Sequence, residues 1–214
     1  MGRMEPHKMA LPLQPALRPA PPWLQRVLLL ACLSCAVLFL GWCQQAWQQP
    51  PRLLHNNSGE DNFVATVERA IDEAGSRVWV MLFVLRQENQ GSGPVTRLVQ
   101  ALARAKDRGV DVQVVLDQSM RWDSDEIERK HFAAQEWLSH LGVPVLIDSL
   151  EQRTHAKTLL IDHDTIIVGS HNWTFSALSR NVELSLKLRS RRLAQQTAEH
   201  FHATPGWQER RSPP

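Results

Sequence analysis

Two long apolar runs separated by an amphipathic segment constrain the fold of this chain more than any other feature of its sequence. RVWVMLFVL, at 77–85, and VDVQVVLD, at 110–117, are nearly continuous apolar stretches, which are typical of strands buried on both faces of a sheet. The segment between them predicts a helix that ends at Gly109, because its apolar residues recur at i, i+3, i+4 and i+7. These residues are Val95, Leu98, Val99 and Leu102. Strand, helix and strand in this order indicate an α/β sheet.

The same alternation continues on both sides of these runs. Residues 61–75 predict a helix, and the spacing of Asp123 and Glu126 predicts a capping box for another helix that ends at Gly142. Further strands are expected at 143–148, twice within 154–173, and at 182–188, and a last helix is expected over 190–202. We therefore expect an α/β fold in which a mixed β-sheet carries helices on both faces.

An apolar segment near the N-terminus predicts one transmembrane helix before this domain. The segment from Val27 to Cys43 has 17 uncharged, mostly apolar residues, close to the shortest length that spans a bilayer. A cleaved signal segment is the alternative, but the small residues of a cleavage site are missing from the sequence that follows. We expect a proline-containing segment at 1–26, an anchor at 27–43, a linker at 44–61 and one domain at 62–214.

Basic residues predict the orientation of this anchor. Four of them precede it, namely Arg3, Lys8, Arg18 and Arg26, whereas Arg52 alone follows closely. The positive-inside rule then keeps the N-terminus in the cytoplasm and puts the domain on the far side, periplasmic or extracellular. With a cleaved signal the domain would be secreted instead.

The rest of the chain is nearly neutral. Of the 24 Lys and Arg and the 22 Asp and Glu residues, four basic residues and Glu5 lie within 1–50, which leaves 20 basic and 21 acidic residues in 51–214. A net charge of −1 gives no general electrostatic reason to expect nucleic acid as a partner. All three cysteines, Cys32, Cys35 and Cys43, lie in the apolar segment, so the domain has neither a disulfide nor a thiolate zinc site.

Polar chemistry concentrates in one stretch of strand-like residues, THAKTLLIDHDTIIVGSHNW at 154–173. Alternate residues of a strand share a face, so His155 and Lys157 are neighbours. An imidazole beside an ammonium suits attack on a phosphoryl centre, because the lysine holds a phosphate oxygen and favours the neutral imidazole. After the next strand, Gly169 would let the backbone come close to a ligand, while Ser170 and Asn172 offer donors for phosphoryl oxygens.

His155-x-Lys157-x4-Asp162 followed by Gly169-Ser170-x-Asn172 resembles the HKD signature of the phospholipase D superfamily, as a single-motif or endonuclease-type member. Composition alone would give the first part of this pattern about 0.01 times in such a chain. The resemblance implies a phospholipase D-like fold from about Asn62 to Phe201. It also implies hydrolysis of phosphodiesters through a covalent phosphohistidine, with neither metal nor cofactor.

The resemblance also implies a role for each residue of the motif. His155 would be the nucleophile, or the acid in the site of the partner. Lys157 and Asn172 would bind phosphate, and Ser170 would support them. Glu183, in Asn181-x-Glu183, would fix the tautomer of the imidazole. Asp162 matches the motif, but it falls on the opposite face of the strand unless the chain turns, so it would organise the site without touching phosphorus. Since the motif occurs once, a C2 homodimer would bring two copies of His155 together.

Three functions remain open at this point. Hydrolysis of phospholipid comes first, because an anchor would hold the site near lipid headgroups. An endonuclease acting on DNA or RNA is the alternative, with the basic residues of 180–192 lining a groove. An inactive membrane adaptor comes third. A metal site formed by Asp162, His163, Asp164 and His171 competes with the motif, but His163 and Asp164 fall where a hairpin turn is expected, and solvated turn residues explain these two better. We expect loops at 87–94 and 118–125 to shape the mouth of the site.

Overall fold

The computed structural model describes residues 21–46, 50–88, 91–117, 125–149, 153–205 and 207. The chain divides into two compact units, Met1–Trp47 and Gln48–Pro214. In the first, α1 (Pro22–Ala46) is a helix of 25 residues. Among the described residues, no helix is both long enough and apolar enough to cross a membrane. The transmembrane helix expected from the sequence is therefore not supported. The membrane orientation and the secreted alternative stay predictions.

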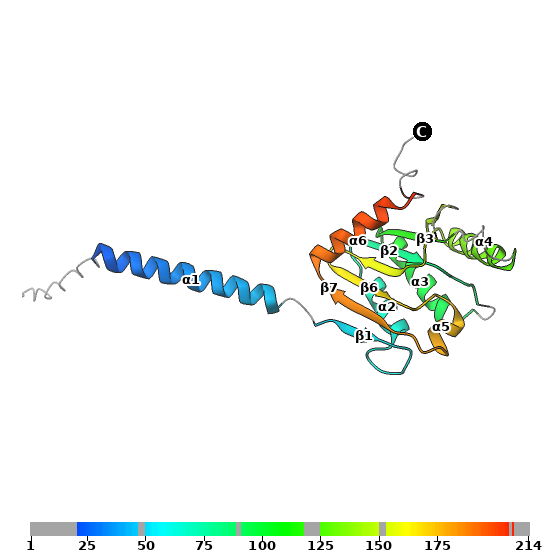
Figure 1. Cartoon of the computed structure of the whole chain (residues 1–214), viewed down its shortest axis with the longest axis horizontal. Coiled ribbons are helices and arrows are strands. Elements are labelled where there is room, and N and C mark those ends of the chain that lie inside the picture. The colour runs from blue at the N-terminus through cyan, green and yellow to red at the C-terminus, as the bar shows by residue number, and fades with distance from the viewer. Residues whose placement is uncertain are drawn as a thin grey trace, which may run out of the picture. The chain divides into compact units, whose positions relative to one another are not determined.

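The second unit is built on one seven-stranded mixed sheet with the strand order β1-β7-β6-β5-β2-β3-β4 (Figure 1). Its parallel half consists of β2 (Arg77–Leu82), β3 (Asp111–Leu116) and β4 (Val145–Ile147). In its antiparallel half, β5 (Lys157–Ile161) pairs with β2, and β6 (Thr165–Gly169), β7 (Ser185–Arg189) and β1 (Arg52–Leu54) follow outward. The mixed sheet expected from the sequence is confirmed.

Helices cover both faces of this sheet. On one face, α2 (Phe63–Asp72), α3 (Pro94–Asp107), α4 (Asp125–His140) and α5 (Phe175–Ser179) contribute buried residues to the larger core. On the other face, α6 (Arg191–Ala203) packs Phe201 against Trp79 and Leu160. The run at 77–85 serves both cores, because Val78 and Val80 face the first and Trp79 and Met81 face the second. This two-sided burial is the reason for its continuous apolarity.

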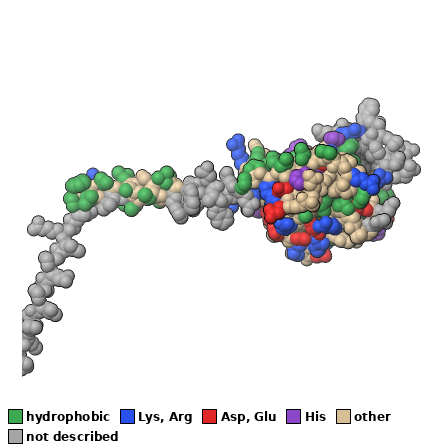
Figure 2. Space-filling view, turned by 90° about the horizontal axis from the view of Figure 1, so that it is seen from below, with side chains coloured by type: hydrophobic (Ala, Val, Ile, Leu, Met, Phe, Trp, Pro, Cys, Tyr) green, Lys and Arg blue, Asp and Glu red, His purple; other side chains and the backbone are tan. Residues whose placement is uncertain are grey.

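The sheet begins earlier than the sequence indicates. Arg52–Leu54, which we expected in the linker, forms β1 and pairs with β7, and Leu54 is fully buried. The expected strand at 182–188 begins only at Ser185, because the residues before it form a loop at the site. In Figure 2 the basic and acidic side chains of the domain lie intermixed on the face shown, in keeping with its small net charge.

Candidate active site

The motif lies at the edge of the sheet where the parallel strands end. β5 begins at Lys157, which pairs with Leu82, the last residue of β2. His155 lies two residues earlier, in the segment that leads into β5. Because the carboxyl ends of β2, β3 and β4 meet at this edge, it is the usual position for a ligand site in an α/β sheet.

His155 and Lys157 are in contact. The Lys157 Nζ lies 3.3 Å from Nδ1 of His155 and donates to the His155 carbonyl oxygen at 2.7 Å. The His155 side chain is exposed, whereas Lys157 is buried. The ring of Phe83 lies under both, with its centroid 4.4 Å from that of the imidazole and 4.9 Å from Nζ. The structure thus brings the two residues together as expected and adds an aromatic support that sequence reasoning missed.

The ammonium group of Lys157 is buried, with carboxylates near it. Burial lowers the pKa of its ammonium below the usual value, and the carboxylates of Glu183 and Asp117 oppose this shift. The two carboxylates act on one ammonium from different elements, the loop before β7 and the end of β3. Both carboxylates therefore favour the charged form of Lys157 against the effect of burial.

Two buried aspartates at the ends of β3 and β4 hold the segment that carries His155. Asp117 accepts a hydrogen bond from the backbone N–H of Thr154 at 2.7 Å, and Asp148 accepts one from the Thr154 hydroxyl. Asp117 and Asp148 are 1% and 3% exposed. The available signal in the sequence was an aspartate directly after each buried strand. We infer that both position His155 through Thr154.

The loop after β6 is tied to the start of β7. Ser170 accepts from the N–H of Leu184 at 3.1 Å, and its own N–H donates to the Leu184 carbonyl at 3.0 Å. A Cβ on Gly169 would lie 2.2 Å from the Ser185 hydroxyl oxygen. The expectation that Gly169 admits a ligand is corrected by this contact, since the glycine makes room for β7. Asn172 Oδ1 is buried and has no hydrogen-bond partner among the described residues.

His171 is a packed residue of this loop. Its side chain is 1% exposed and stacks on Phe63 with ring centroids 3.9 Å apart. Its Nδ1 lies 2.7 Å from the Ser185 hydroxyl and its Nε2 lies 3.1 Å from Oδ1 of Asn56. Burial lowers the pKa of His171 to about 4, the charge of His55 acts in the same direction, and Glu183 opposes them. The imidazole is therefore neutral at physiological pH and connects the loop to the first turn of the domain.

Glu183 lies near the site, but its hydrogen-bond partner among the described residues is Asn181, at 3.0 Å. The structure thus shows an electrostatic effect of Glu183 on Lys157 and His171, and the expected hydrogen bond to His155 is not observed. Trp173 next to the loop is fully buried, which identifies it as a packing residue.

Asp162 lies at the opposite end of β5 from Lys157. It adopts a positive φ of 52° in the β5–β6 turn and accepts hydrogen bonds from the N–H groups of Gly75, Ser76 and Arg77. Burial alone would raise the pKa of Asp162, but these bonds, led by those from Ser76, hold it below the usual value. The structure does not bring Asp162 to the other motif residues, and its contacts hold the turn before β2.

The structure also separates the residues of the competing metal site. Asp164 pairs with Arg189, His163 lies 3.1 Å from the Arg77 guanidinium, and His171 is buried at the other end of the sheet. Within the described part of the chain, no group of three or more His, Cys, Asp or Glu residues is placed to hold a metal ion.

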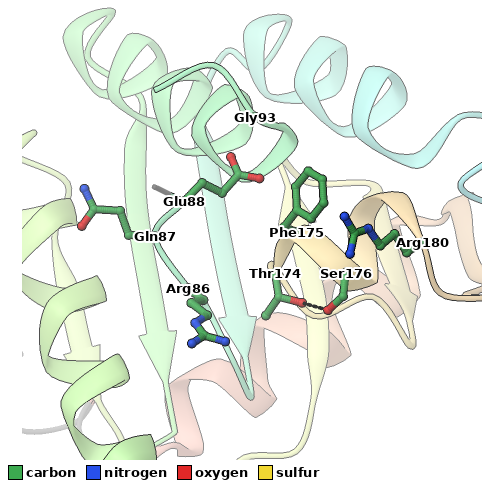
Figure 3. A pocket seen from close by; sticks show the side chains of 8 residues that line it. All are labelled: Arg86, Gln87, Glu88, Gly93, Thr174, Phe175, Ser176 and Arg180. Carbon is green, nitrogen blue, oxygen red and sulfur yellow. Dashed lines mark hydrogen bonds between the residues drawn. The ribbon is translucent and has the colours of Figure 1, made fainter. Parts of the chain in front are cut away.

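Two hollows lie at this edge of the sheet. One, of about 320 Å³, has His155 in its wall together with Arg153, Asp148 and residues at the end of α6. The other, of about 520 Å³, lies between the segment after β2 and the start of α5 (Figure 3). Gln87, Glu88 and Gly93 line this second hollow, and the expectation that residues 87–94 shape the mouth of the site stays a prediction. Most of the loop expected at 118–125 lies outside the described residues.

Comparison with known proteins identifies the fold. Nuc from Salmonella typhimurium, a phospholipase D family member, superposes with a TM-score of 0.56 and 28% identity over 75% of this chain and 94% of its own. NucT from Helicobacter pylori has a TM-score of 0.55 at 15% identity, over 72% and 94% of the two chains, which shows similarity of fold alone.

Sequence relatives agree with this result. A curated phospholipase D from Rickettsia prowazekii (strain Madrid E) is 32% identical over 104 residues, which cover 49% of this chain and 47% of the relative. The chain therefore spans about half the length of the curated relatives that it matches. The family model described as "Cardiolipin synthase, PLD-like domain" matches residues 67–204, a range that contains the whole motif and more than half of the chain. The chain belongs to this family of the phospholipase D superfamily.

Proposed function

We propose that this protein is a phosphodiesterase in which His155 is the nucleophile. The observation that carries the proposal is the exposed imidazole of His155 beside the buried ammonium of Lys157, at the end of the parallel strands. Nδ1 of His155 faces Lys157, so Nε2 is the nitrogen that reaches phosphorus. Lys157 and Asn172 then hold the phosphoryl oxygens through the ammonium and the amide N–H groups. Oδ1 of Asn172, which has no hydrogen-bond partner among the described residues, leaves the hydrogen bonding of this side chain incomplete in the unbound site.

The proposed reaction has two displacements. Nε2 forms a P–N bond as the ester oxygen leaves, and that oxygen takes a proton from a second imidazole. Water then attacks phosphorus, returns a proton to the second imidazole and breaks the P–N bond, which releases the phosphate monoester. Every step uses protein side chains and water, so we propose a reaction that needs no metal.

We propose that the second imidazole is His155 of another copy in a C2 homodimer. The surface around the motif supports this assembly. Val182 and Leu184 flank Glu183 in the sequence, and they are 98% and 51% exposed. Apolar side chains exposed beside a polar site are typical of an interface.

We propose phospholipid as the substrate, because the curated relatives bear the name phospholipase D. The pocket of Figure 3 favours a second candidate, single-stranded nucleic acid, because arginines and an exposed aromatic ring line it. The two candidates share the bond that is cleaved and the residues that cleave it.

The test is to incubate the full chain in EDTA with phospholipid vesicles and, separately, with single-stranded DNA and RNA. We expect EDTA-resistant release of headgroup from the vesicles, and we expect His155→Asn to abolish it. A phosphorus-labelled substrate should label the wild-type chain through an acid-labile bond. His163→Asn is the matched control, since His163 lies in the exposed turn at the other end of β5. Activity that EDTA removes, or that survives in His155→Asn, would contradict the mechanism.

A further inference from the structure

The hollow of about 320 Å³ beside the proposed nucleophile has no role in the reaction described above. Residues 153–156, which lead into β5, form one side of it, with His155 in the wall. His200 and residues 203–205, at the end of α6, form another side. A volume of this size is at the small end of ligand pockets. The hollow therefore has room for one small group that is attached to the phosphorus at His155.

One cation of this hollow, Arg153, shares an aromatic ring with the motif. Its guanidinium carbon lies 5.6 Å from the centre of the Phe83 ring, and the imidazole of His155 lies 4.4 Å from the same centre. The guanidinium is therefore at most about 10 Å from the imidazole. The side chains of Arg153 and His155 are both exposed. A substrate bound at His155 is thus within reach of Arg153.

Asp148 adds a carboxylate to the lining, and both of its oxygens have partners. Oδ1 accepts from the N–H of Ser149 at 2.8 Å, and Oδ2 accepts from the hydroxyl of Thr154. Asp148 is 3% exposed, whereas Arg153 and His200 are exposed. A ligand in this hollow would therefore meet a guanidinium and an imidazole. A guanidinium suits phosphate and carboxylate groups, because its planar fork donates two parallel hydrogen bonds to them.

The charge of the hollow indicates which part of a phospholipid would occupy it. The diacylglycerol part is apolar and uncharged, so it gives a guanidinium nothing to bind and would desolvate it. The headgroup is polar, and an acidic group on it lies roughly 5–8 Å from phosphorus at ordinary bond lengths. This distance is compatible with the separation of Arg153 and His155. The hollow therefore suits a headgroup that carries an acidic group of its own.

We propose that this hollow binds the headgroup of the substrate, and that Arg153 and His200 contact a phosphate or a carboxylate that the headgroup carries in addition to the scissile phosphate. Arg153 is then a specificity-determining residue outside the motif. The inference rests on the proposed phosphodiesterase, because it names the class of headgroup that this activity releases. Binding of a headgroup needs no cleavage, so the two proposals can fail separately.

The first test is binding to the full-length His155→Asn protein. The probes are glycerophosphoinositol 4-phosphate and glycerophosphoinositol, which differ by one phosphate group, and isothermal titration calorimetry measures the affinity of each. We expect the phosphorylated probe to bind about tenfold more tightly, the effect of one charge-assisted contact. Adding Arg153→Gln should remove this difference. Adding His200→Gln should reduce it by about threefold, the effect of one ordinary hydrogen bond.

The second test is headgroup release by the full chain from phosphatidylinositol 4-phosphate and from phosphatidylinositol, each in detergent micelles. Arg153→Gln should raise KM for phosphatidylinositol 4-phosphate about tenfold and leave kcat unchanged, because a contact made equally in the ground state and the transition state acts on KM alone. Both constants for phosphatidylinositol should stay as in the wild type.

Arg192→Gln is the matched control, because Arg192 is also exposed but lies at the other end of α6. Thermal melting verifies that each variant is folded. A general attraction to the more negative micelle would respond to both arginine substitutions alike, and that result would overturn the proposal. Equal affinity of the two probes would also overturn it, as would an effect of Arg153→Gln seen only in cleavage of single-stranded DNA. Arg153-dependent binding of the phosphorylated probe without any cleavage by the wild type would support the headgroup site and count against the proposed phosphodiesterase alone.

Discussion

Acidification should destabilise this domain through His171. Burial lowers the pKa of this imidazole from its ordinary value of 6.5 to about 4. Between these two values the unfolded chain binds a proton that the folded domain does not, so stability is complete above the unfolded pKa and declines as the pH falls toward 4. At 1.36 kcal/mol for each pH unit between these two pKa values, the loss is limited to about 3 kcal/mol. About 2 kcal/mol of it falls between roughly pH 7 and pH 5.

Urea unfolding of the full chain, followed by tryptophan fluorescence, measures this loss across that pH range. His171→Asn removes the titrating group, so it should lower stability at neutral pH but abolish most of the pH dependence. The control is His163→Asn, because His163 is exposed in the β5–β6 turn, and it should keep the wild-type slope. If His171→Asn lost as much free energy on acidification as the wild type, another group would be responsible and the reasoning would be refuted.

Three further substitutions separate residues that hold the fold from residues that position the nucleophile. Gly169→Ala puts a methyl group 2.2 Å from the Ser185 hydroxyl oxygen, so it should lower stability by about 1–3 kcal/mol in urea unfolding. Asp162→Asn weakens several charge-assisted bonds at the far turn, which should cost about 1–2 kcal/mol and leave kcat unchanged. A loss of kcat in the folded protein would instead make Asp162 part of the reaction. Thr154→Val frees Asp148 from its hydroxyl partner and should lower kcat more than it raises KM, whereas equal effects on both would contradict a positioning role.

The sequence was most informative where local pattern and burial coincide. The run at 77–85 predicts β2 because both faces of that strand are buried, with Val80 on one side and Trp79 on the other. β1 was missed because RLL is too short to show a period, and its place depends on pairing with Lys187 and its neighbours, far along the chain. A strand stabilised by distant pairing leaves little local signal.

In the site, too, the sequence predicts the contacts between residues close along the chain and misses those between distant residues. His155 and Lys157 are two residues apart on extended chain, so strand geometry predicts their contact. Asp162 matches the spacing of the motif, but spacing does not show that the chain turns there with a positive φ. The bonds of Thr154 to Asp117 and of His171 to Asn56 span 37 and 115 residues, and no local pattern predicts contacts at such separations.

The anchoring of Asn56 has a consequence for glycosylation. Asn56-Asn57-Ser58 has the form of an N-glycosylation acceptor. In the folded domain its Nδ2, the atom that would carry the sugar, donates to the carbonyls of Ala177 and Asn181 at 2.8 and 2.9 Å. A glycan would remove one of these N–H groups and force a bulky substituent against α5. Nδ2 of Asn56 is therefore not available for glycosylation once the domain has folded. In a chain glycosylated before folding, Asn56 could not make the contacts that connect it to α5 and to His171.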